Sequence, residues 1–142
     1  MDGCVGRVLA RIVYSDRPYP PLPRSIRDGF AVRAADFPGS VRVVGEVRAG
    51  SRFENDVNAG EAVEIMTGAP VPAGADAVIM VEHARRDGDS ITTDHPVSAG
   101  DFIVPKGAEC CPGAAVLDAG TRIDFGHVPV LASVGATALD VF

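Results

Sequence analysis

Lysine, tryptophan and long apolar runs are scarce in this sequence of 142 residues. Tryptophan is absent, aromatic residues make up 6% of the chain, and Lys106 is its single lysine. No apolar run approaches the roughly 20 residues that a transmembrane helix requires. The beginning of the sequence also lacks the basic and apolar regions of a signal peptide. We therefore expect a cytoplasmic protein that does not interact with a membrane.

Positive charge is limited too, and so are cysteines. The chain has 13 Lys and Arg against 19 Asp and Glu, a formal net charge of −6 and a sequence pI of about 4.9. Because an acidic surface repels the phosphate backbone, nucleic acid is not an expected partner. Cys4 and the adjacent Cys110 and Cys111 form no C-x-x-C pair, so we expect free thiols. The three histidines lie far apart in the sequence.

Glycine and proline are plentiful, with 16 and 11 copies. Together with runs of β-branched residues, they favour many short strands joined by turns. The turn signal Asp87-Gly88-Asp89 predicts a hairpin that leads into residues 90–93. Further strands are expected over residues 42–47, 61–66 and 77–83. The predicted fold class is therefore mainly β, as a small barrel or sandwich.

The two ends of the chain have a different character. Residues 5–13 have one apolar helical face, although their valines also suit a strand. Four prolines exclude a helix from residues 14–23, which we expect to be extended and to cross between domains. We predict a hairpin of residues 114–117 and 121–123, a helix over 125–134 with Asp124 as its cap and Gly135 at its end, and a strand over 138–142. These ends would form a minor α+β subdomain, residues 1–22 and 108–142, around an inserted β-rich domain, residues 23–107.

Two turns could carry chemistry. Asp28 lies before Gly29, at a turn that follows the proline-rich segment. Its carboxylate could bind a metal or accept a proton, or it could simply cap its own turn. Thr67 opens a stretch rich in glycine, alanine and proline, residues 67–76. Its hydroxyl and close-approaching backbone amides could bind an anion, or the stretch could be a rigid linker between two strands.

Several blocks together resemble the molybdopterin molybdenumtransferase family, represented by the gephyrin E domain and its bacterial counterparts. The strongest blocks are DGFAVRAAD at residues 28–36 and EIMTGAPVP at residues 64–72. GADAV at 74–78 and MVE at 80–82 continue the likeness, while GRVLA at 6–10 and LASVG at 131–135 extend it over nearly the whole chain. The ordered set is specific, although no single block is.

The resemblance implies a function in molybdenum-cofactor biosynthesis. Family members insert molybdate into adenylylated molybdopterin and release AMP, assisted by a divalent metal, expected to be magnesium. They are larger than this chain and form homodimers, in which the β-domain of one subunit faces the pterin-binding α/β domain of the other. The resemblance therefore assigns this chain the β-domain half-site only, without activity on its own.

The family's functional residues map onto several positions here. Asp28 and Thr67 match its catalytic aspartate and threonine, and Asp28 together with Glu109 would bind the metal. Matching positions that would serve substrate binding are Ser25, Gly68, Ala69 and Glu82.

Three departures from the family pattern favour an alternative. The usual Asp-Asn-Ser block is Pro23-Arg24-Ser25 here, an arginine is replaced by Val104, and an aspartate is replaced by Glu109. Losing an oxyanion-binding arginine removes two-pronged contacts that Lys106 cannot fully replace. The alternative is a non-catalytic dimerisation or partner-binding module that retains the family fold.

Overall fold

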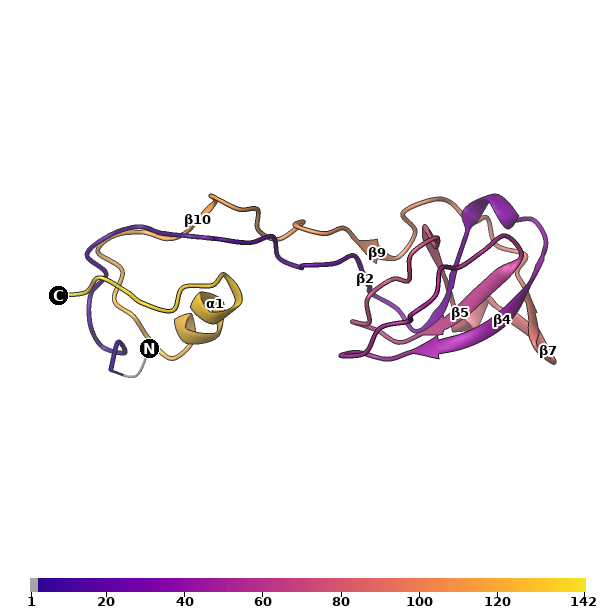
Figure 1. The fold of residues 1–142 in the computed structure, drawn as a ribbon, viewed down its shortest axis with the longest axis horizontal. Coiled ribbons are helices and arrows are strands. Elements are labelled where there is room, and N and C mark those ends of the chain that lie inside the picture. Colours follow the sequence, from indigo (N-terminus) through magenta and orange to yellow (C-terminus); the bar gives the residue numbers. More distant parts are fainter. Residues whose placement is uncertain (1–2) are drawn as a thin grey trace. The chain divides into compact units, whose positions relative to one another are not determined.

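The computed structural model describes residues 3–142, which divide between two compact units (Figure 1). We call Leu22–Pro105 the β-unit, and Met1–Pro21 together with Lys106–Phe142 the end unit. Residues 1 and 2, with which the predicted end subdomain begins, lie outside the described residues. The end unit is thus assembled from both ends of the chain, while the β-unit is one continuous segment.

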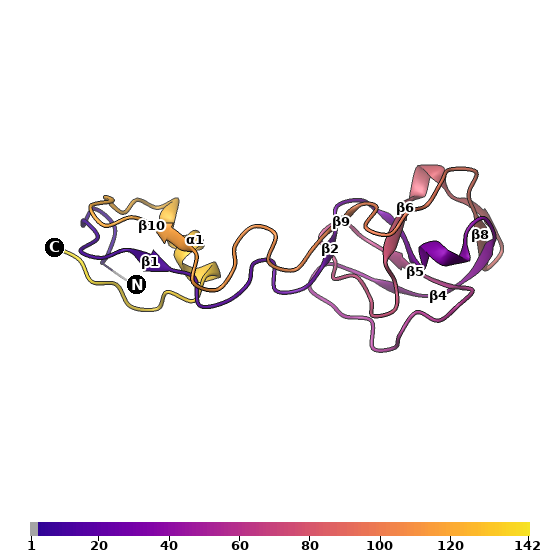
Figure 2. The ribbon, with the colours of Figure 1, turned by 90° about the horizontal axis from the view of Figure 1, so that it is seen from above.

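The β-unit is built on a six-stranded sheet with the strand order β6-β3-β5-β4-β8-β7. All neighbouring strands are antiparallel except β4 and β5, which are parallel. Figure 2 shows the sheet curling into a half-barrel. Its strands are β3 (Gly29–Val32), β4 (Ser40–Val47), β5 (Glu61–Ile65), β6 (Ala77–Met80), β7 (Arg85–Asp87) and β8 (Ser90–Thr92).

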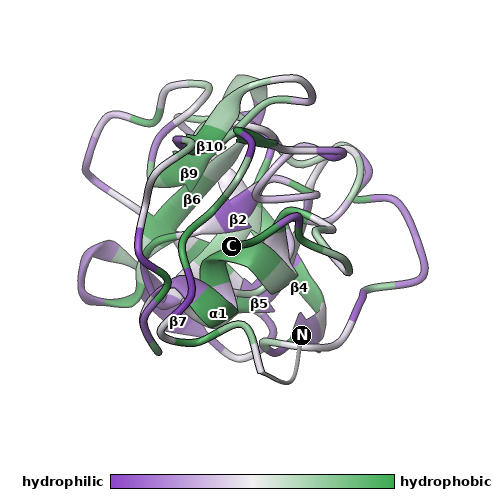
Figure 3. Ribbon diagram, turned by 90° about the vertical axis from the view of Figure 1, so that its left-hand side faces the viewer, coloured by the Kyte–Doolittle hydropathy of each residue, from purple (hydrophilic) through white to green (hydrophobic). Residues whose placement is uncertain are grey.

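Alternation along the strands gives the sheet a core on each face. On β3, Phe30 and Val32 belong to one buried cluster and Ala31 to the other. The first cluster also takes Val41 and Ile91, and the second takes residues such as Ile65. In Figure 3, β6 is coloured hydrophobic and the edge strand β7 is hydrophilic. All four residues of β3 are buried, so the whole strand belongs to the core of the unit.

Shorter elements complete the β-unit next to the sheet. Strand β2 (Arg24–Ser25) pairs antiparallel with β9 (Ile103–Val104). Two 3-10 turns, η1 (Ala34–Asp36) and η2 (Val81–His83), follow β3 and β6. The predicted strand over 77–83 is therefore too long at its end. It stops at Met80 because the Val81 N–H donates to the carbonyl of Asp28 (3.0 Å) and the chain turns.

The end unit has a smaller core of its own, centred on Cys4, Leu9 and Ile123. Strand β1 (Val13–Tyr14) pairs with β10 (Ala115–Leu117), and the helix α1 (His127–Ser133) buries Leu131. The two ends of the chain also meet, since Leu9 bridges Val141. Across residues 3–142, none of the helices has the length and apolar character that crossing a bilayer needs.

The prediction of a mainly β fold is confirmed, and so is the hairpin turn, in which Asp87 of β7 pairs with Ser90 of β8. Predictions for the end segments fared less well. The predicted hairpin of residues 114–117 and 121–123 is wrong, because β10 pairs with β1 and Arg122 bridges Val8 instead. Both partners come from the opposite end of the chain, which local periodicity does not reveal.

Other boundaries also differ from the predictions. Residues 5–13 form no helix; Gly6 has a φ of 87°, and Val8 and Leu9 make isolated bridges before β1 begins at Val13. Helix α1 begins at His127, two residues later than expected, although the Asp124 carboxylate does accept the His127 N–H (3.1 Å). In the predicted last strand, 138–142, only Val141 forms a bridge.

Candidate functional site

Asp28 lies at the entrance of β3, where the backbone of the next residue is tightly enclosed. A Cβ atom on Gly29 would lie 1.9 Å from the carbonyl oxygen of Ile79 on β6, so only glycine fits there. This close approach anchors the first residue of β3 against its neighbour. Asp28 itself is exposed. The packing of Gly29 therefore holds the aspartate at the end of a rigid, buried strand.

Thr67 occupies a tight turn that follows β5. The Ala69 N–H donates to the carbonyl of Met66 (3.0 Å), and Gly68 has a φ of 80° at the third position. A positive φ at that position is the mark of a type II turn, for which glycine is preferred. The sequence Met66-Thr67-Gly68-Ala69 is therefore suited to this turn, and it leaves Thr67 exposed at the corner.

The two turns meet. Both the Thr67 amide and the Thr67 hydroxyl donate to Oδ1 of Asp28, each at 2.6 Å, across 39 residues of sequence. The hydroxyl bond, followed by the amide bond, lowers the pKa of Asp28 below its ordinary value of 3.8, against a smaller effect of burial. Asp28 is therefore an oriented carboxylate that is ionised at neutral pH.

The charge of Asp28 is stabilised by uncharged donors, so it is not neutralised. Both hydrogen bonds end on Oδ1, which leaves Oδ2 available to a cation or to a donor on a substrate. An ionised carboxylate repels molybdate and phosphate at close range. Contacts to oxyanions would therefore have to come from other groups, such as the exposed Arg27 that directly precedes Asp28.

Ser25, predicted to bind substrate, is buried, with 2% of its surface exposed. Its hydroxyl donates to the carbonyl of Arg27 (2.5 Å) and accepts the Arg27 N–H (3.2 Å). Both hydrogen-bonding functions of the hydroxyl are thus used inside the protein. A direct contact with substrate would require these bonds to break.

The remaining predicted substrate-binding residues are Gly68, Ala69 and Glu82. The Gly68 N–H donates to the carbonyl of Ser25 (2.8 Å), and the Ala69 N–H is used within the type II turn. These amides are therefore engaged within the protein, so their predicted contact with an anion would need the turn to open. Glu82 is exposed in η2, directly after Val81, whose amide donates to the main-chain carbonyl of Asp28.

Magnesium usually takes one or two carboxylates, with water and substrate phosphates as its other ligands. Within residues 3–142, no group of three or more His, Cys, Asp or Glu side chains could hold a metal ion. Asp28 offers one free carboxylate oxygen, whereas Glu109, the other predicted ligand, belongs to the end unit. The two predicted ligands therefore belong to different units, and their joint binding of a metal stays a prediction.

The structure also brings together residues that sequence spacing did not connect. The rings of His83 and His95 stack with their centroids 3.8 Å apart and their planes 17° apart. In the end unit, a hollow of about 490 Å³ is lined by Tyr19, Glu109, Cys110 and Ser133, among others. The three cysteines are free, as predicted. No spacing rule links positions 83 and 95, because the whole β7–β8 hairpin separates them.

The β-unit is a curled, mostly antiparallel half-barrel that carries an Asp–Thr pair at its turns. It is inserted in the sequence between the two segments of the end unit. The fold and the site therefore define a class of two-part β modules. The family model described as the MoeA N-terminal region, domains I and II, matches residues 1–135. The chain belongs to this family, which confirms the resemblance noted in the sequence.

Individual relatives agree with this placement. Molybdopterin molybdenumtransferases of Staphylococcus epidermidis and Staphylococcus aureus are 33% and 34% identical over alignments that cover 99% of this chain. The solved structure of a molybdopterin biosynthesis MoeA protein from Pyrococcus horikoshii has a TM-score of 0.92 and 34% identity over 99% of this chain. The chain spans 35% of the curated relatives' length and 38% of that solved chain.

Proposed function

We propose that this chain acts in molybdenum-cofactor biosynthesis in the cytoplasm, as the β-domain half-site of a molybdopterin molybdenumtransferase. In this proposal, Asp28 and Thr67 take part in the insertion of molybdate into adenylylated molybdopterin, which releases AMP. A pterin-binding α/β domain supplies the rest of the active site. The observation that carries the proposal is the pair of 2.6 Å hydrogen bonds from Thr67 to Asp28.

The two side chains divide the work by their chemistry. Thr67 fixes one carboxylate oxygen of Asp28 and lowers its pKa, which favours the ionised form. The other oxygen can accept a proton or hydrogen bond from the substrate, or share a cation that arrives with the nucleotide phosphates. Predicted substrate contacts from Gly68, Ala69 and Glu82 would lie around this pair. Because two domains must hold the reacting groups within a fraction of an ångström, the chain alone is not expected to turn over.

We include a homodimer in the proposal, with the β-unit of one subunit facing the pterin-binding domain of the other. That arrangement is what the family resemblance implies. Sedimentation of the chain, alone and with the added domain, would measure the oligomeric state directly.

A second candidate is a non-catalytic module that dimerises or binds a partner. Val104, on β9, occupies the position where the family resemblance expects an arginine, and an apolar side chain cannot hold an oxyanion. The amides of Thr67, Gly68 and Ala69 are also engaged within the protein. Both observations favour a chain that has kept the fold without the full binding set.

Reconstitution in two parts separates the candidates. The chain would be mixed with the pterin-binding remainder of the Staphylococcus epidermidis relative, molybdate and adenylylated molybdopterin, and AMP release would be measured. We expect release with the natural chain and a loss of about 100-fold or more with Asp28→Asn. Asp16→Asn serves as the matched control, since Asp16 is an exposed aspartate of the end unit whose pKa is also lowered.

The relative's own N-terminal region, added in the same way, shows whether the remainder works in two parts. If that region restores AMP release and the folded natural chain does not, the half-site proposal is wrong and the module is favoured.

A further inference from the structure

The hydroxyl of Ser25 closes a local turn just before Asp28. It donates to the carbonyl of Arg27 and accepts the Arg27 N–H, so the side chain bonds both main-chain polar groups of a residue two positions away. Serine hydroxyls commonly stabilise turns through such short-range bonds. Asp28 follows immediately. The direction in which its backbone leaves the turn is therefore set by the Ser25 side chain.

The main chain of Ser25 is hydrogen-bonded to the turn that carries Thr67. Its carbonyl accepts the Gly68 N–H (2.8 Å), and its own amide donates to the carbonyl of Ala69 (3.0 Å). Gly68 and Ala69 are the last two residues of the turn that presents Thr67. Ser25 is thus joined through its side chain to Arg27, the residue before Asp28, and through its backbone to Gly68 and Ala69, the two residues after Thr67.

The contact between Asp28 and Thr67 tolerates little displacement. Two donors converge on a single oxygen at 2.6 Å, and hydrogen bonds weaken steeply once distance or angle departs from the favoured range. Both donors are carried by one residue and the acceptor by another, on separate turns. A residue that is hydrogen-bonded to both turns can therefore set the distance between them.

We infer that Ser25 is a positioning residue, which holds Asp28 and Thr67 in register through its buried hydroxyl and its two main-chain bonds to the turn of Thr67. The inference rests on the proposed function only for its consequence in catalysis. The geometric role belongs to the chain itself and can be measured without any activity.

The end unit contains a matched control. Ser15, with 3% of its surface exposed, donates its hydroxyl to the carbonyl of Arg17 (2.6 Å) and accepts the Arg17 N–H (3.4 Å). Ser15→Ala therefore removes the same group from the same kind of turn. No hydrogen bond connects Ser15 to Asp28 or Thr67 in the described part of the chain. Any effect of losing a buried hydroxyl in general would appear in both variants.

The experiment is a carbon-13 NMR titration of the Asp28 carboxyl in the full chain, for the natural sequence, Ser25→Ala and Ser15→Ala. We expect Ser25→Ala to raise the pKa of Asp28 toward its ordinary value, because the hydrogen bonds from Thr67 loosen. Ser15→Ala should leave that pKa unchanged. An unchanged Asp28 titration in folded Ser25→Ala would overturn the inference, and so would an equal rise in both variants.

If Ser25→Ala does not fold, Ser25→Cys keeps nearly the same side-chain shape while weakening the hydrogen bonds. It should then raise the Asp28 pKa part of the way, and no rise in folded Ser25→Cys would contradict the proposal. This second variant keeps the titration decisive whatever the stability of the first.

The reconstituted assay provides the second readout. We expect Ser25→Ala to lower kcat for AMP release about 10-fold with KM nearly unchanged, because it disturbs the placement of Asp28 and leaves the binding groups in place. A titration that shifts while the natural chain releases no AMP would support the positioning role and contradict the proposed function. AMP release that is unaffected by Ser25→Ala would support the proposed function and contradict the positioning role.

Discussion

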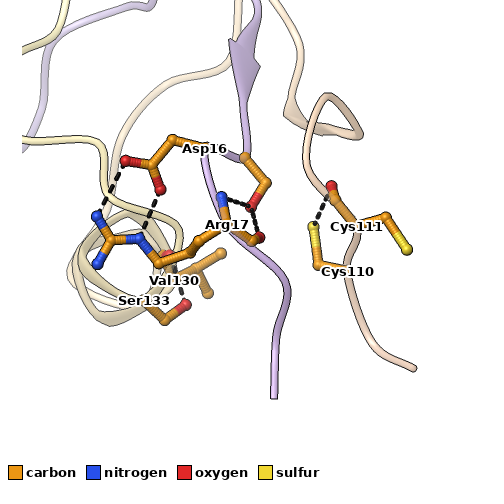
Figure 4. Close-up of polar contacts among 7 residues, drawn as sticks. Asp16, Arg17, Cys110, Cys111, Val130 and Ser133 are labelled. Carbon is orange, nitrogen blue, oxygen red and sulfur yellow. Dashed lines mark hydrogen bonds and ion pairs between the residues drawn. The ribbon is translucent and has the colours of Figure 1, made fainter. Parts of the chain in front are cut away.

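The two units each contain a Ser-x-Arg turn closed by a buried serine, yet the aspartates beside these turns are in opposite electrostatic situations. Asp16 lies inside the turn of the end unit, where the Arg17 guanidinium contacts both of its carboxylate oxygens, at 2.5 and 2.9 Å (Figure 4). Asp28 follows the turn of the β-unit and is bonded by Thr67. One aspartate pairs with a charge next to it in sequence, and the other with neutral donors from a distant turn.

The difference decides what remains available for chemistry. The pKa of Asp16 is lowered mainly by its hydrogen bond to Arg17, and the attraction of that positive charge adds to the effect. Its charge is therefore neutralised locally. The pKa of Asp28 is lowered by hydrogen bonds alone, so its negative charge persists on an exposed surface. Two similar local turns thus give a structural aspartate in one unit and a candidate functional aspartate in the other.

The largest expected effect on stability comes from adding a Cβ atom to a glycine close to each aspartate. These glycines are Gly29, which follows Asp28, and Gly135, which lies against the Asp16 carboxylate. Gly29→Ala places a Cβ atom 1.9 Å from the Ile79 carbonyl, which is backbone of the central sheet and cannot move cheaply. We expect a loss of about 3 kcal/mol or more in the free energy of unfolding, measured by urea denaturation. The Asp28–Thr67 contact should be lost with it.

Gly135→Ala is the matching change in the end unit. Its Cβ would meet the Asp16 carboxylate at 2.2 Å, but that side chain is exposed and can swing away, so the positive φ of 80° dominates. We expect a loss of about 1 to 2 kcal/mol. Equal losses of unfolding free energy for Gly29→Ala and Gly135→Ala would contradict the conclusion that Gly29 is packed more tightly than Gly135.

The next prediction tests the role of the uncharged hydrogen-bond donors of Thr67. Thr67→Val keeps the shape of the side chain and the amide bond but removes the hydroxyl, so the pKa of Asp28 should rise toward 3.8. Carbon-13 NMR of the carboxyl checks this directly. The pKa of Asp16 should not change, and a change at both sites would point to a general loss of structure.

The same variant gives a dependence of stability on pH. The pKa of Asp28 is lower in the folded chain, so its contribution to stability is present above the unfolded value, 3.8, and is lost as pH falls through the folded value. Thr67→Val should therefore be less stable than the natural chain at neutral pH, with the gap shrinking as Asp28 becomes protonated. A gap that widens in acid would contradict this account.

The smallest expected effect concerns salt. Added salt screens exposed ion pairs, so about 1 M sodium chloride should raise the pKa of Asp16 while leaving that of Asp28 nearly constant. Arg17→Gln should raise the Asp16 pKa at low salt and abolish most of its salt dependence. The comparison would fail if the two aspartates responded to salt equally.

Sequence carried the description of the β-unit further than that of the end unit, for a physical reason. Strands such as β4 and β5 are β-branched and bounded by turn residues, and the β7–β8 hairpin is closed by Gly88 at a φ of 58°. These signals are local, so they can be recognised without knowing the partner strand. The end unit depends on pairing between segments such as β1 and β10, about a hundred residues apart. Its predicted hairpin and helix boundaries were wrong accordingly.

The candidate site shows the same limit. Asp28 and Thr67 are candidates from their turns alone, and the family resemblance assigns their roles, but nothing in their spacing requires them to meet. Besides the hydrogen bonds of Ser25, their contact depends on β3 pairing with β5 in one register, in which Gly29 lies opposite Ile65. The internal bonding of Ser25 could not be anticipated either, since a serine before a turn is common. Only coordinates reveal that its hydroxyl is buried and fully engaged.

The pairing of residues 8–10 with residues 140–142 has a mechanical consequence. The Ala10 amide donates to the Asp140 carbonyl (2.8 Å) and the Phe142 amide to the Val8 carbonyl (2.9 Å), so the two segments run side by side within the end unit. A stretching force applied between Gly3 and Phe142 would act first on the hydrogen bonds between these two segments. While these two segments stay paired, no force reaches the β-unit. An optical-tweezers experiment should therefore show the end unit unfolding before the β-unit.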